Sequence, residues 1–75
     1  MTTTKITDSS QIAEIGYSPN TQILTVQFKR KGVWYAYADV PAHIHDEFTK
    51  AKSKGKFFHK NIRGAYEYRR IHEEI

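Results

Sequence analysis

The chain has 75 residues, which is enough for one small domain and too few for two. It contains no cysteine, which excludes disulfide bridges, cysteine-based zinc sites and thiol catalysis and favours a reducing compartment. We expect a cytoplasmic protein without a membrane span, because its first residues are polar and no stretch approaches the ~20 apolar residues of a spanning helix. The formal net charge is +4, and residues 29–72 hold 11 Lys and Arg against four acidic side chains, so the charge predicts one positive face.

Three strands are predicted in the first half of the chain. The clearest one contains Leu24, Val26 and Phe28, which alternate with polar residues as in a half-buried antiparallel strand. The first strand is weaker because its apolar residues are three apart, and the third is rich in aromatic and β-branched residues. In chain order, we expect a strand over 9–17, a turn over 18–21, a strand over 22–29, a turn over 29–32 and a strand over 33–40.

The hydrophobic period changes from two to 3.6 after the third strand. Pro41 suits the first turn of a helix, where its missing N–H needs no partner. Ile44, Phe48 and Ala51 follow at intervals of four and three, which predicts an amphipathic helix. Residues 53–55 are typical of a helix end, because glycine, here Gly55, is common just after the last turn of a helix.

A second helix is predicted from about Lys56 onwards. Its apolar stripe is Phe58, Ile62 and Tyr66, and Gly64 should end or bend it. The fold class is therefore α+β, a three-stranded antiparallel β-meander followed by two helices packed on one face. The expected segments are a flexible lead-in over residues 1–8, the domain over 9–70 and a C-terminal tail over 71–75.

The richest candidate for function is the segment between the two predicted helices and the start of the second. Residues 50–63 carry six positive side chains and no acidic one. The backbone N–H groups that begin the second helix would add partial positive charge, so we expect a phosphate-binding lobe. The alternative is a solvated charged loop that only aids solubility. The basic residues that we assign to the binding site here are Lys52, Lys54, Lys56, Lys60 and Arg63.

A second candidate is the aromatic pair Tyr35 and Tyr37 on the third strand, with Arg30 and Lys31 just before it. Tyrosines two apart share one face of a strand, and exposed sheet aromatics stack on bases in several RNA-binding folds. The alternative is that both tyrosines pack in the core. Alternation places Trp34 on the opposite face, and the sequence leaves open which face carries the helices.

No catalytic, metal or cofactor site is expected. His43 and His45 lie two apart on a predicted helix and so point to different sides, which prevents them from sharing a metal. Asp46 and Glu47 are typical of acidic residues towards the start of a helix, where their negative charge interacts favourably with the helix dipole. No serine lies in a motif that would activate it, and the small core leaves little room for an enclosed substrate pocket. We therefore predict a binding module rather than an enzyme.

The order of these features resembles the KTSC domain, a family named for its occurrence at the C-terminus of some lysyl-tRNA synthetases. It also occurs as a small stand-alone protein in bacteria and their phages. The resemblance covers residues 9–70, and one departure is His59, where the family pattern leads us to expect Asn. The matching residues are Ser9-Ser10, Ile12, Ile15-Gly16-Tyr17, Leu24, Val26, Phe28, Gly32, Tyr35-Ala36-Tyr37, Val40-Pro41, Ala51-Lys52-Ser53-Lys54-Gly55, Phe57-Phe58, Ile62-Arg63 and Tyr66.

The resemblance implies a cytosolic α+β domain for which RNA binding is suggested. Combined with the basic segment, it leads to a monomeric nucleic-acid-binding module as the first hypothesis. The second is a protein-interaction module, such as a small bacterial or phage regulator that docks on an acidic partner surface. A sensor or enzyme for a small anionic ligand ranks last, because no phosphate loop is present. The sequence does not distinguish RNA from DNA, and it assigns neither a sequence preference nor a pathway.

Overall fold

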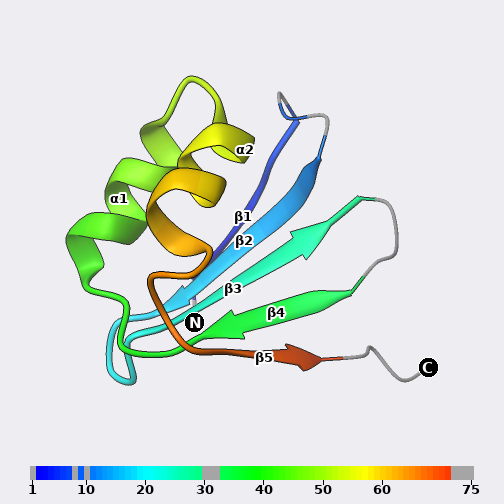
Figure 1. The fold of residues 1–75 in the computed structure, drawn as a ribbon. Coiled ribbons are helices and arrows are strands. Elements are labelled where there is room, and N and C mark those ends of the chain that lie inside the picture. Colours follow the sequence, from blue (N-terminus) through cyan, green and yellow to red (C-terminus); the bar gives the residue numbers. More distant parts are fainter. Residues whose placement is uncertain (1, 8, 10, 30–32, 72–75) are drawn as a thin grey trace.

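The computed structural model describes residues 2–7, 9, 11–29 and 33–71. Within them the chain forms a five-stranded antiparallel sheet in which each strand pairs with its neighbour in sequence (Figure 1). The α+β class and the antiparallel meander are confirmed, whereas the expected number of three strands is wrong. The strands are β1 (Thr2–Lys5), β2 (Ile12–Ser18), β3 (Ile23–Phe28), β4 (Trp34–Tyr37) and β5 (Tyr68–Ile71).

The two strands that the sequence did not predict are the edge strands β1 and β5. β1 pairs with residues 14–17 of β2, and β5 pairs with all four residues of β4. Every side chain of β5 is exposed, so neither alternation nor an apolar run marks it. Backbone pairing is what defines these strands. The expected lead-in therefore contains β1, and Ile71 of the expected tail belongs to β5; residues 1, 8 and 72–75 lie outside the described ones.

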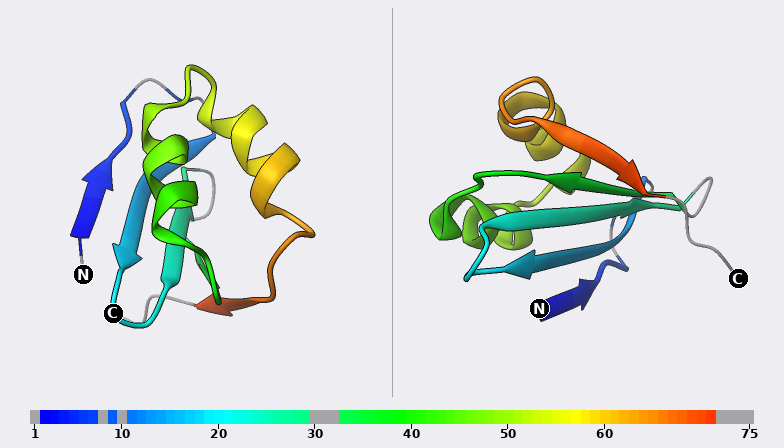
Figure 2. Two further views of the ribbon diagram at one scale, coloured as in Figure 1. Left: turned by 90° about the vertical axis from the view of Figure 1, so that its left-hand side faces the viewer. Right: turned by 90° about the horizontal axis from the view of Figure 1, so that it is seen from below.

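The helices all cover one face of the sheet, as Figures 1 and 2 show. They are α1 (Ala42–Lys50), α2 (Lys54–Phe57) and the π-helical turn η1 (Phe58–Ile62). Packing of two helices on one face is thereby confirmed. Tyr37 is only 3% exposed and packs against Phe58, so the covered face is the one that carries Tyr35 and Tyr37. Trp34 lies on the open face because side chains alternate along β4.

β4 is shorter than the predicted strand over 33–40, so residues 38–41 form the connection to α1. β4 ends at Tyr37, and Asp39 adopts a left-handed conformation with φ of 58° that no strand can continue. The buried Val40 then returns to the sheet, where its N–H donates to the carbonyl of Gln22 and its carbonyl accepts from the Tyr17 hydroxyl at 2.6 Å. These two bonds fix where α1 begins.

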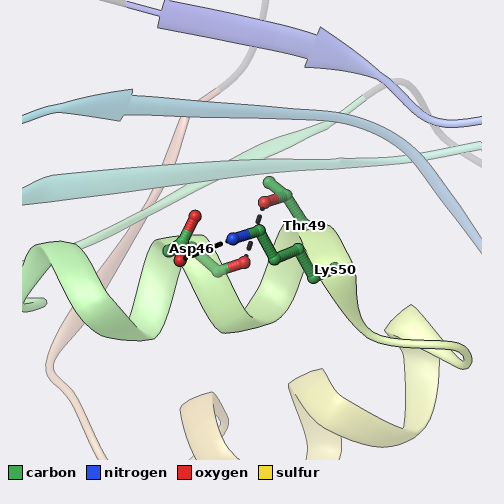
Figure 3. A network of polar contacts seen from close by, with 3 residues as sticks. All are labelled: Asp46, Thr49 and Lys50. Carbon is green, nitrogen blue, oxygen red and sulfur yellow. Dashed lines mark hydrogen bonds and ion pairs between the residues drawn. The ribbon is translucent and has the colours of Figure 1, made fainter.

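The outer side of α1 is polar. Lys50 forms an ion pair with Asp46 at 3.1 Å, and the Thr49 hydroxyl donates to the Asp46 carbonyl at 3.0 Å (Figure 3). The two charged side chains are 74% and 62% exposed, so the pair adds little to stability. Phe48 points the other way and is fully buried.

The second helical segment runs over residues 54–62 and begins two residues earlier than predicted. The Ser53 hydroxyl accepts from the Lys56 N–H, which makes residues 53–55 a helix start instead of the predicted end of α1. The Arg63 N–H donates to the Phe58 carbonyl at 2.9 Å, five residues back, so the last turn is widened. Gly64, with φ of +81°, then ends the helix, and Tyr66 lies beyond it.

Phe58 is the residue at which the helices and the sheet meet. Its ring contacts Phe28 of β3 at 5.2 Å, Tyr37 of β4 at 5.6 Å and Phe48 of α1 at 6.4 Å between centroids. Edge-to-face geometry in the first two pairs is the favourable one for aromatic rings. One buried side chain therefore joins four elements of the fold.

Phe58→Ala is expected to lower the free energy of unfolding by about 3–5 kcal/mol, because it removes this ring and leaves a cavity. A domain of this size has a total stability of roughly 4–11 kcal/mol, so the variant should be close to unfolding. Urea denaturation followed by circular dichroism measures the change. Phe57→Ala is the matched control, since Phe57 is only partly buried; equal losses for both variants would contradict the role of Phe58.

His45 is a titratable group inside the fold. Its ring stacks on Tyr17 with centroids 4.7 Å apart and planes 8° apart, and its Nε2 is buried without a hydrogen-bond partner among the described residues. Burial lowers the pKa of His45 below its ordinary value of 6.5, and the neighbouring Asp46 opposes this shift only in part. The neutral ring is therefore the form that the folded chain favours.

Acidification should destabilise the domain through His45. Because the folded pKa is depressed, the stabilisation is complete above the unfolded value of about 6.5 and is lost as the pH falls through the folded pKa. We expect the melting temperature to decrease between about pH 7.5 and pH 5, and His45→Phe, which keeps a stacked ring, to flatten that decrease. His43→Phe changes an exposed position of the same helix as a control. A pH dependence that is identical in both variants would rule out His45 as its source.

Candidate functional site

Residues 54–62 present two different faces. Lys54, Phe58 and Ile62 recur at intervals of four and are buried against the sheet and α1. The positions between them carry the outward side chains Lys56, His59 and Lys60, and Arg63 continues the same direction beyond the helix end; all four are exposed. Because Lys54, Phe58 and Ile62 are buried, the basic side chains between them face the solvent. We call residues 56, 59, 60 and 63 the basic stripe.

A pocket of about 320 Å³ lies at the start of this helical segment. None of the described side chains that line it is acidic, and three are lysines, so its charge favours an anion. Hydroxyl and amide groups supply further hydrogen-bond donors. The lining residues are Ser9, Gln11, Lys52, Ser53, Lys54, Gly55, Lys56 and His59.

The wall of the pocket opposite the lysines comes from the segment before β2. The Ser9 hydroxyl accepts hydrogen bonds from the N–H groups of Gln11 and Ile12 at 3.2 and 3.1 Å, which fixes the bend of this segment. The Gln11 side chain lies so close to Gly55 that a Cβ there would meet its Oε1 at 2.8 Å. A side chain at position 55 would therefore make the flexible end of the Gln11 side chain shift.

Lys54 differs from the other predicted phosphate-binding lysines because it is only 8% exposed. Its Nζ donates to the Ala51 carbonyl at 3.0 Å, at the C-terminal end of α1. A cation at this position satisfies a free carbonyl and the negative end of the helix dipole. Lys54 thus joins α1 to the next helix, whereas Lys52 and Lys56 reach solvent at the pocket.

The predicted residues Lys60 and Arg63 do not line the pocket but continue away from it along the basic stripe. The Arg63 guanidinium lies 3.4 Å from Nδ1 of His59, and His59 lines the pocket. This contact links the pocket to the end of the helix, which lies roughly 10 Å from Lys56 along the helix axis. The structure therefore places a continuous row of cationic and polar groups on one side of the molecule.

The predicted tyrosines belong to an aromatic cluster on the face of the sheet that the helices cover. Tyr37 is buried, and Tyr35 is partly buried against Phe28 at 5.5 Å, so the alternative of core packing accounts for both. Burial, with smaller contributions from Tyr68 and Tyr35, raises the pKa of Tyr37 to about 12, although Arg63 acts in the opposite direction. The positive charge of Arg63 thus acts on the hydroxyl of Tyr37.

The sequence prediction and the structure overlap only in part. Arg30 and Lys31 lie outside the described residues. Ser9, Gln11 and His59 line the pocket but were not predicted to be site residues. His59 could have been found from its spacing of three from Lys56 on one helix face, whereas nothing in the sequence around Ser9 and Gln11 indicates that they lie opposite Gly55.

The described parts of the chain lack two kinds of feature. No group of three or more His, Cys, Asp or Glu side chains is arranged so that it could hold a metal ion there. No helix in these parts has the length and apolar character needed to cross a membrane.

Comparisons with known proteins agree with the resemblance noted in the sequence. The family model of the KTSC domain matches residues 8–68. The crystal structure of a KTSC domain protein from Yersinia pestis is similar to this chain with a TM-score of 0.88 and 38% identity, covering 95% of this chain and 97% of that one. The resemblance to the KTSC family is thereby confirmed.

Curated relatives of two sizes are similar to the chain. A lysine–tRNA ligase of Nostoc sp. is 39% identical over 64 residues, which are 85% of this chain and 11% of the ligase. The chain thus spans about a ninth of the ligase that it matches. An uncharacterised protein of Stutzerimonas stutzeri is 36% identical over 64 residues, which are 84% of this chain and 89% of that protein.

The two lysines that flank Gly55 should have separate roles in stability. Lys54→Met removes the cation from the Ala51 carbonyl and is expected to lower the free energy of unfolding by about 1–2 kcal/mol. Lys56→Met changes an exposed lysine two residues away and should stay within about 0.5 kcal/mol of the parent. Urea denaturation of both variants measures the difference. If Lys54→Met proved as stable as Lys56→Met, the Lys54–Ala51 bond would not support the fold.

Proposed function

The chain belongs to the KTSC domain family, and from this premise we propose that it is a small, non-catalytic RNA-binding module that works as a monomer in the cytoplasm. The observation that carries the proposal is the acid-free lining of the pocket, with its three lysines, and its continuation into the basic stripe. Phosphates of a nucleic-acid backbone are the ligands that such a row of cations attracts most strongly.

The individual residues have distinct roles in this proposal. Lys52 and Lys56 contact a phosphate at the pocket, and Ser53 and Gln11 donate hydrogen bonds there. Lys60 and Arg63 contact the next phosphates along the basic stripe. Lys54 adds positive potential from its buried position but keeps its bond to Ala51.

RNA is favoured over DNA by the kind of protein in which similar segments occur. A similar segment is part of lysine–tRNA ligases, which act on a tRNA. A module without cysteines also suits the reducing cytoplasm, where RNA is available. The proposal therefore takes single-stranded RNA as the first ligand to test.

The domain should bind a single-stranded RNA of about ten nucleotides with an affinity that decreases steeply from about 50 to 200 mM salt. Fluorescence anisotropy of a labelled strand measures this dependence. Replacement of Lys52, Lys56 and Lys60 together by Gln should weaken binding and reduce the slope of log affinity against log salt by roughly 2, because each phosphate contact contributes about 0.7.

The control variant replaces Lys5, Lys50 and Arg69 by Gln, which changes the net charge by the same amount. All three residues are exposed, and none of them lines the pocket or belongs to the basic stripe. Equal weakening in both triple variants would mean that net charge alone attracts RNA, and the proposed site would be wrong. If the parent domain binds no RNA at low salt, the RNA proposal fails, and docking on an acidic protein becomes the function to pursue.

A further inference from the structure

Tyr68 is the first residue of β5 and carries the most exposed large apolar side chain in the described part of the chain, at 59%. Ile71 follows at 45%. The two point to opposite faces of the sheet because they are three residues apart on one strand. Tyr68 pairs with Tyr37 and so lies on the face that carries the helices.

The ring of Tyr68 is held by two other tyrosines. Its centroid lies 5.7 Å from that of Tyr35 and 5.5 Å from that of Tyr37. Tyr37 is itself fixed by an edge contact with the buried Phe58. The side of Tyr68 against this cluster is thus occupied, while more than half of the side chain remains open to solvent.

Two arginines bring positive charge to the aromatic cluster that contains this ring. Arg70, two residues further along β5, is on the same face and pairs with Tyr35. The charge of Arg63 acts to lower the pKa of Tyr37, and Arg63 contacts His59 of the pocket lining. Tyr68 thus has Arg70 on its own face of β5, and Arg63 of the basic stripe acts on the neighbouring Tyr37.

We propose that Tyr68 stacks on a nucleobase of a single-stranded nucleic acid whose phosphates follow the basic stripe, with Arg70 beside the same base or its phosphate. This inference rests on the proposed function and deepens it by naming the residue that contacts the base. A held ring with a free face loses little entropy on stacking, and base–aromatic stacking tolerates any sequence. Tyr35 and Tyr37 are the residues for which the sequence predicted base stacking. In this inference they hold the ring of Tyr68 in place instead.

The test compares one labelled single-stranded RNA of about ten nucleotides with the same backbone lacking bases. Tyr68→Ala and Tyr68→Leu should each weaken binding of the RNA roughly 5- to 100-fold, since both remove the aromatic face and Leu keeps apolar bulk. Tyr68→Trp should restore it. None of these variants should change binding of the base-free strand, and Ile71→Ala, on the other face of β5, should leave both ligands unaffected.

Three results would contradict the inference. If Tyr68→Leu bound the RNA as tightly as the parent, stacking of a base on Tyr68 would be ruled out. An equal loss for the base-free strand would mean that Tyr68 acts through the fold or the charges and not through a base. A parent domain that binds neither ligand at low salt would overturn the proposed function and the stacking with it, whereas the first two results would leave the proposed function intact.

Discussion

Burial of Phe58 is the interaction on which the rest of this structure depends. Its ring lies between β3, β4 and α1 and contacts an aromatic ring from each of them. Because Phe58 and Ile62 must both face the core, the helix that carries them has one possible rotation about its axis. That rotation decides which side chains meet solvent, and these are the residues of the basic stripe.

The same constraint explains why one predicted binding residue has another role. Lys54 occupies the first position of the buried stripe, four residues before Phe58. Its long apolar stem suits that position, and its ammonium group finds the Ala51 carbonyl at the end of α1. A cation within a basic segment is therefore not automatically a ligand-binding group. The lysines on either side of it, Lys52 and Lys56, are the exposed ones.

The candidate site and the core are built from the same elements in a domain this small. The pocket is formed where the segment before β2 meets the start of α2, with the Gln11 side chain against Gly55. The aromatic cluster that supports Tyr68 is also part of the core through Tyr37 and Phe58. Rigid support of this kind keeps exposed groups in place without an additional domain, which is consistent with a module that also occurs as a small part of larger ligases.

The sequence by itself determined the class of the fold, the alternation of Leu24, Val26 and Phe28, the helical stripe of Phe58 and Ile62, and the concentration of positive charge. These features are local, because periodicity and composition follow from neighbouring residues. Only the tertiary structure decided that Tyr37 faces the helices, since a period of two is identical for both faces of a strand. It also decided that Thr2–Lys5 and Tyr68–Ile71 are strands, because an edge strand is defined by backbone bonds to a partner that the sequence pattern does not contain.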